Sequence, residues 1–64
     1  MLADNLKRYR ASKGLSQDQL ARKAGITYST LTKLESGVNQ NPKVKTLQRI
    51  AKALEVTLDD LMKE

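Results

Sequence analysis

The chain has 64 residues, so it forms at most one small domain that needs an efficient core. It contains no cysteine and no histidine, which excludes disulfides, zinc bound by those residues, thiol nucleophiles and imidazole catalysis. We therefore expect a protein that is not an enzyme and that needs no metal or cofactor. A net charge of +5 favours an anionic partner, either a nucleic acid or a membrane surface.

The first predicted element is an amphipathic helix at the N-terminus. Leu2, Leu6 and Tyr9 are three and four residues apart, which is helical spacing. Gly14 is the left-handed residue at which we expect this helix to stop. A second helix is predicted over residues 17–24.

A capping-box pattern marks the start of the second helix, because Gln19 follows Ser16 by three residues. Gly25 ends that helix and allows a sharp turn. Thr27 then caps a third helix that ends at Ser36 and Gly37. With Leu31 and Leu34 of the third helix buried, its exposed residues are Tyr28, Ser29, Thr32 and Lys33.

The third helix presents side chains that suit the major groove of DNA. They are short or hydrogen-bonding, with one cation and one large ring, and the groove is about 12 Å wide. Two helices joined by a short turn with glycine, over residues 17–36, fit a helix-turn-helix.

Two further helices are predicted after a polar loop over residues 38–43. Apolar spacing predicts one over residues 44–54, and a capping box of Thr57 and Asp60 opens a short fifth helix. The expected fold is therefore all-α, a compact bundle of five short helices that forms one domain over residues 1–64.

At this point the chain resembles a known family. The segment LSQDQLARKAGITYSTLTKLESG is similar to the helix-turn-helix of lambda-repressor-like, Cro/cI-type DNA-binding domains, the XRE family. The similarity extends to Leu6, Tyr9 and Arg10 before it and to VKTLQRIAKALEVTLDDL after it. With no cysteine and no apolar signal-peptide core at the N-terminus, the chain is expected to be cytoplasmic. The resemblance implies a nucleoid-associated protein of a prokaryote or phage.

The resemblance implies DNA contacts position by position. Gln17 would bind a phosphate through its side chain and the helix N-terminus. Tyr28, Ser29 and Lys33 match positions that meet base edges, with a thymine methyl or a phosphate as the target of Tyr28 and guanine as that of Lys33. The alternative for Tyr28 and Lys33 is an ordinary surface residue. Contacts to the sugar-phosphate backbone are implied for Thr27, Thr32, Asn39, Asn41 and Lys43.

Arg10 and Glu35 match a pair that forms a buried salt bridge between the first and third helices of the family. Two positions depart from the family pattern. Tyr28 stands where glutamine or serine is frequent, so the family's operator preference does not carry over. Glu55 stands where glycine commonly ends the fourth helix, which leaves the geometry of that end open.

The charges are unevenly distributed along the chain. Residues 1–13 carry four cations and one carboxylate, and residues 38–54 carry four cations and no carboxylate. Residues 55–64 carry four carboxylates and one lysine, so we expect this end to point away from DNA. It either closes the monomer core or meets a second copy, and the candidates for that homodimer contact are Val56, Leu58, Leu61 and Met62.

The leading hypothesis is a sequence-specific double-stranded DNA-binding regulator, a repressor that acts as a homodimer on a palindromic operator. The alternative is an antitoxin-type module that binds a partner protein and regulates its own promoter. Single-stranded and RNA targets are disfavoured by the presence of only two aromatic residues. Membrane-surface binding is disfavoured because the cations do not face a large apolar stripe on one helix.

Overall fold

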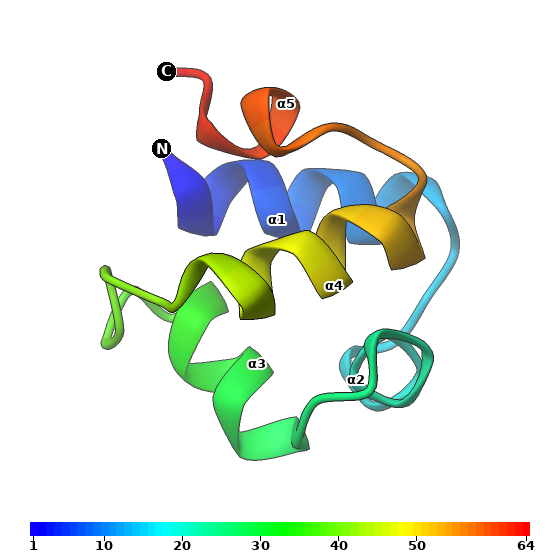
Figure 1. Cartoon of the computed structure of the whole chain (residues 1–64). Coiled ribbons are helices and arrows are strands. Elements are labelled where there is room, and N and C mark those ends of the chain that lie inside the picture. The colour runs from blue at the N-terminus through cyan, green and yellow to red at the C-terminus, as the bar shows by residue number, and fades with distance from the viewer.

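Five α-helices and no strand make up the computed structural model, which describes residues 1–64. The all-α prediction is confirmed. None of the helices is long and apolar enough to span a membrane. Figure 1 shows α5 at the top, α1 directly below it, α4 across the middle, and the pair α2 and α3 at the bottom. The helices are α1 (Leu2–Ser12), α2 (Gln17–Ala24), α3 (Tyr28–Glu35), α4 (Val44–Leu54) and α5 (Leu58–Met62).

Both predicted capping boxes are present at helix starts. At α2, the Ser16 hydroxyl accepts from the Gln19 backbone N–H at 3.1 Å, and the Gln19 side chain accepts from the Ser16 N–H at 2.8 Å. At α5, Thr57 and Asp60 exchange the same two bonds, each at 3.0 Å. Each box satisfies two backbone donors that a helix start leaves without partners.

Left-handed residues end α2 and α4. Gly25 ends α2 with φ 71°, as the sequence predicts. Glu55 ends α4 with φ 59° and ψ 41°, so a residue with a side chain adopts the conformation that glycine takes most easily. The helix end that this departure from the family pattern left open is therefore left-handed, at the steric cost of a Cβ in that region.

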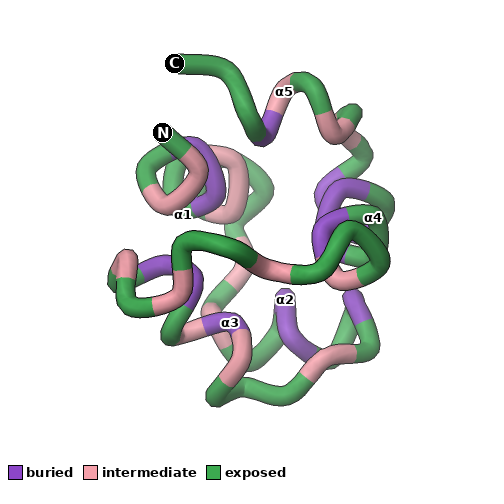
Figure 2. The backbone as a smooth tube through the Cα atoms, turned by 60° about the vertical axis from the view of Figure 1, so that its left-hand side comes forward, coloured by how far each residue is buried: buried purple, intermediate pink, exposed green.

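The core is built from aliphatic side chains of all five helices. Figure 2 shows that the buried stretches of α1, α2, α3 and α4 are the parts turned toward the middle of the fold. Leucine is the commonest residue among the fully buried side chains. The fully buried side chains are Leu6, Leu20, Leu31, Leu34, Ile50, Leu54 and Leu61.

A buried asparagine fastens the C-terminal helix to α1. Asn5 is 5% exposed, and its amide nitrogen donates to the carbonyl of Leu61 at 2.8 Å and to that of Lys63. The amino group of Met1 also donates to the Lys63 carbonyl, so the two chain ends lie together, as Figure 1 shows. Asn5 interrupts the apolar stripe of the first helix, and that interruption was the available signal for its role.

Candidate nucleic-acid interface

The turn between α2 and α3 holds the two helices across each other. Gly25 takes the left-handed conformation, and the Ile26 N–H donates back to the Ala21 carbonyl at 3.0 Å. The Thr27 hydroxyl then accepts from the Thr30 N–H at 3.1 Å and starts α3. In Figure 1 α2 is seen nearly end-on beside the start of α3, which lies across it.

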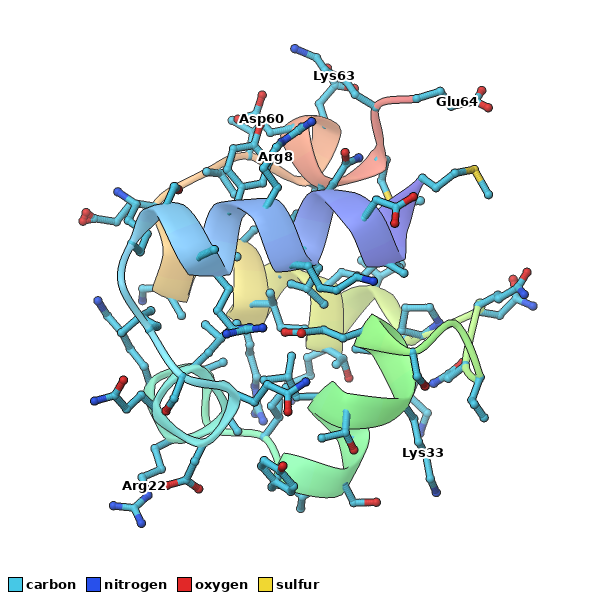
Figure 3. The ribbon with its side chains drawn as sticks, turned by 180° about the vertical axis from the view of Figure 1, so that it is seen from behind. Arg8, Arg22, Lys33, Asp60, Lys63 and Glu64 are labelled. Carbon is cyan, nitrogen blue, oxygen red and sulfur yellow. The ribbon has the colours of Figure 1, made fainter.

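One side of α3 is exposed to solvent. Tyr28 is 53% exposed, and Ser29 and Lys33 are exposed as well. Leu31, Leu34 and Glu35 of the same helix are buried. At 100° per residue, the three exposed residues fall within an arc of about 140°. Figure 3 shows Lys33 pointing away from the body of the protein.

A buried carboxylate links α1 to α3 behind this face. Glu35 is 3% exposed, and its two oxygens accept from Arg10 Nε at 2.7 Å and Arg10 Nη2 at 3.0 Å. The remaining Arg10 nitrogen, Nη1, donates to the Leu15 carbonyl at 2.8 Å. The pair implied by the resemblance is therefore present, in the bidentate form that gives the strongest geometry.

The side chain of Gln17 is held inside this network. Its Nε2 donates to Glu35 Oε1 at 3.1 Å, and its Oε1 accepts from the Tyr28 hydroxyl at 3.4 Å. The sequence suggested a phosphate contact for Gln17 and gave no sign of these two bonds, because they depend on how three helices meet. The amide nitrogen has a second hydrogen, so one donor remains beside the N-terminus of α2.

The two threonines proposed to contact the backbone of DNA already make bonds within α3. Thr32 donates its hydroxyl hydrogen to the Ser29 carbonyl at 3.0 Å and is half-buried. The hydroxyl of Thr27, which caps the helix, is also hydrogen-bonded to the hydroxyl of Thr30 at 2.8 Å, and either oxygen can be the donor. Because phosphate oxygens only accept, a contact from Thr32 would require its internal bond to break.

The loop after α3 presents donors beside the same face. The Asn39 backbone N–H donates to the Lys33 carbonyl at 3.0 Å, which fixes the loop to the end of α3. The Asn39 side-chain oxygen accepts from the Asn41 N–H at 3.0 Å, which leaves its amide nitrogen as a donor. Asn41 and Lys43 are exposed.

The acidic end of the chain lies far from α3. In Figure 3 Asp60 and Glu64 are at the top of the molecule, whereas Lys33 and Arg22 project at the bottom. The pKa of Asp60 is lowered mainly by the hydrogen bond from the Thr57 backbone N–H and then by that from the Thr57 hydroxyl.

No cluster of three or more carboxylate, histidine or cysteine side chains is placed to hold a metal ion.

The four candidates for a homodimer contact differ in accessibility. Leu61 has no exposed surface and packs inside the monomer core, so it is not available to a second copy and this assignment is corrected. Val56 and Leu58 are half-buried and pack against the same core. Met62 is 52% exposed. Leu61 and Met62 differ in exposure because consecutive helix residues are about 100° apart around the axis, so Leu61 faces the core and Met62 faces solvent.

A capped pair of crossed helices, with a polar exposed face on the second, defines a helix-turn-helix domain. A sequence model of the helix-turn-helix family matches residues 6–61, and the chain belongs to this family, as a domain of the lambda-repressor-like, Cro/cI type.

Several relatives are transcriptional regulators by name. The chain is 34% identical over 64 residues to the HTH-type transcriptional regulator SinR of Bacillus subtilis, which covers all of the chain and 58% of SinR. It is 41% identical over 61 residues to SlrR of the same organism, covering 95% of the chain and 40% of SlrR. The chain thus spans little more than half the length of SinR.

Solved structures of SinR are also similar. The structure of SinR, the master regulator for biofilm formation, in complex with DNA superposes with a TM-score of 0.95 at 33% identity, over 98% of this chain and 100% of that one. The N-terminal DNA-binding domain of SinR from Bacillus subtilis gives a TM-score of 0.95 at 34% identity, over 100% and 93%. The complex of SinR with the SinI protein gives 0.96 at 34% identity, over 100% and 62%.

Proposed function

We propose that this chain binds double-stranded DNA sequence-specifically and regulates transcription, as a repressor that covers promoter elements. The observation that carries the proposal is the exposed face of α3, which presents Tyr28, Ser29 and Lys33 from a rigid, capped helix. The relative SinR is described in complex with DNA, and this chain matches its DNA-binding domain. The proposed role is binding and not catalysis.

In the proposed complex α3 enters the major groove and the N-terminus of α2 approaches the DNA backbone. Gln17 offers its remaining amide hydrogen to a phosphate, and Asn39, Asn41 and Lys43 offer donors from the following loop. Thr32 contributes only where its bond to the Ser29 carbonyl breaks, whereas Thr27 contributes its hydroxyl hydrogen where the Thr30 hydroxyl donates to it. The acidic end on α5 points away from the negatively charged duplex.

Specific recognition requires two copies in this proposal. An eight-residue helix is about 12 Å long and reads few base pairs. Two copies with recognition helices about 34 Å apart would read both halves of a palindrome. Met62 with the accessible parts of Val56 and Leu58 forms the proposed contact.

The test is selection of binding sites from random duplex DNA, combined with sedimentation of the protein alone and with the selected DNA. Enrichment of a two-fold symmetric motif and a complex of two chains per duplex are expected. If no motif is enriched at moderate salt, the proposal of sequence-specific binding fails. A motif bound by a single chain would remove the homodimer and leave DNA recognition in place.

A protein partner is a second candidate function, because the relative SinR is described in complex with SinI. The end formed by α5 combines exposed Met62 with the acidic residues Asp59 and Glu64. Co-purification of a stoichiometric partner with the tagged chain, lost on changing Met62 to Glu, would support this function.

A further inference from the structure

The buried Glu35 fixes the orientation of the Gln17 amide. A carboxylate paired with arginine is ionised and can only accept hydrogen bonds. Glu35 Oε1 receives the Gln17 Nε2 at 3.1 Å while its partnership with Arg10 holds it in place. A flipped amide would set the carbonyl oxygen of Gln17 against the carboxylate, so nitrogen must face Glu35 and oxygen must face the other way.

The orientation of Gln17 in turn sets the polarity of Tyr28. The atom that faces the Tyr28 hydroxyl is Gln17 Oε1, at 3.4 Å, and a carbonyl oxygen only accepts. The hydroxyl therefore turns its hydrogen toward Gln17. At 3.4 Å the bond is longer than is usual for two oxygens, and Gln17 Oε1 is the protein group to which the Tyr28 hydroxyl donates. What the hydroxyl offers to solvent is its lone pairs.

We propose that Tyr28 reads an exocyclic amino group in the major groove, the N6 of adenine or the N4 of cytosine, through a hydroxyl that the protein presents as an acceptor. In the major groove only those two bases carry a hydrogen-bond donor, whereas guanine and thymine show acceptors and a methyl group. Phosphate oxygens are acceptors too. The inference rests on the proposed DNA-binding function, and it replaces the thymine methyl or phosphate target suggested by the sequence.

The position of Tyr28 suits this role. It is the first residue of α3, 53% exposed, and the N-terminal residues of a recognition helix are those that reach base edges. Its ring is carried by a helix whose next turn is anchored by buried Leu31. In the proposed complex the Tyr28 hydroxyl therefore lies at the groove as a hydrogen-bond acceptor.

The experiment is site selection from random duplex DNA by the wild-type chain and by Tyr28→Phe in parallel. One position of the wild-type motif should favour adenine or cytosine over guanine and thymine by about three- to tenfold, the effect of one neutral hydrogen bond. Tyr28→Phe should lose that preference and keep the others. Tyr9→Phe is the matched control, because Tyr9 packs against the core from α1 and should leave the motif unchanged.

One change in the DNA base and one in the protein test the base amino group and the Gln17 carbonyl separately. Replacing the favoured adenine by purine, or the favoured cytosine by pyrimidin-2-one, removes the amino group alone and should weaken wild-type binding by the same factor, while Tyr28→Phe is unaffected. Gln17→Met keeps the side-chain length but removes the carbonyl. The Tyr28 hydroxyl is then free to donate, so the preference for amino bases should fall below about twofold, which a purely structural role of Gln17 would not produce.

The outcomes separate this inference from the function beneath it. If the wild type enriches no motif, the proposed function fails and the inference fails with it. If a motif is enriched but the position altered by Tyr28→Phe favours guanine or thymine, or no position is altered, the inference alone is overturned. Equal weakening of all sequences by Tyr28→Phe would assign the hydroxyl to a phosphate and would also overturn it.

Discussion

Glu35 is the residue on which the interface depends most. Its carboxylate receives Arg10 from α1 and Gln17 from α2 while it belongs to α3. Taking a carboxylate out of water is costly unless its lone pairs are used, and here both oxygens are bonded. One buried acid therefore aligns the three helices that form the candidate DNA-binding surface.

Removing the cation from this pair should be strongly destabilising. Arg10→Met leaves Glu35 buried without its charge partner, and the expected loss is about 3–5 kcal/mol in the free energy of unfolding. A domain of this size has roughly 3–10 kcal/mol in total. Urea unfolding followed by circular dichroism measures the loss. The double variant Arg10→Met with Glu35→Met should be more stable than Arg10→Met alone. If the losses in unfolding free energy of Arg10→Met and Glu35→Met instead add up in the double variant, the ion pair is not the cause of the destabilisation.

Two lysines beside α3 should differ in what they contribute to binding. Lys33→Ala should relax base preference at one or two positions at a cost of about 1–3 kcal/mol, because Lys33 lies on the exposed face of α3. Lys43→Ala, in the loop, should weaken all sequences alike and reduce the salt slope by about one. Titrations of a selected site and a scrambled site at several salt concentrations compare them. A uniform loss from Lys33→Ala would remove it from base reading.

At the scale of helices, the sequence was a good guide to starts and ends. Capping residues such as Ser16 and Thr57 act within four residues, so local chemistry decides them. The network of Arg10, Gln17 and Glu35 brings together residues up to 25 positions apart. Its ion pair followed from family resemblance, but the bonds of Gln17 did not, because they depend on how α1, α2 and α3 converge.

The end of α4 offers a test of backbone strain. Glu55 has φ 59°, a conformation in which a Cβ costs about 1–2 kcal/mol. Glycine at this position removes that steric cost, but part of the gain is offset because glycine loses more chain entropy on folding. Glu55→Gly should therefore raise the free energy of unfolding by about 0.5–1 kcal/mol. Glu55→Ala is the matched control, since it removes the same charge and keeps the Cβ. Equal gains from both variants would assign the effect to charge.

The start of α5 should weaken in acid. Hydrogen bonds from the Thr57 backbone and hydroxyl lower the pKa of Asp60 below its ordinary value of 3.8. Because the folded pKa is the lower one, the stabilisation is complete above pH 3.8 and is lost as the pH falls through the lowered pKa. The stability difference between wild type and Asp60→Asn should be constant near neutral pH and shrink in that acid range. Thr57→Ala removes the hydroxyl but keeps the backbone N–H, which is the larger cause, so in that background the pH dependence should be reduced and not abolished.

At the scale of the whole molecule, charge is separated between two ends. The chain measures 25 × 21 × 19 Å along its principal axes, and Figure 3 shows Asp60 and Glu64 at the end opposite Lys33. Figure 3 also shows Arg8 and Lys63 at the end of Asp60 and Glu64, so that end carries mixed charge, whereas Lys33 and Arg22 project at the α3 end. Steering of DNA toward the protein should favour the α3 end.

The separation of charge predicts a salt-dependent effect of the acidic end. Asp59→Asn with Glu64→Gln removes two negative charges from the α5 end of a molecule that measures 25 × 21 × 19 Å (Figure 1), so the proposed DNA at the α3 end lies beyond the Debye length of about 8 Å at 0.15 M salt and within that of about 30 Å at 0.01 M. DNA affinity should therefore change by less than about 1.5-fold at the higher salt and rise by about threefold or more at the lower. Fluorescence anisotropy with a labelled selected site measures both. A severalfold rise at 0.15 M would mean that the acidic end lies close to the DNA, and the proposed orientation of α3 in the groove would then be wrong.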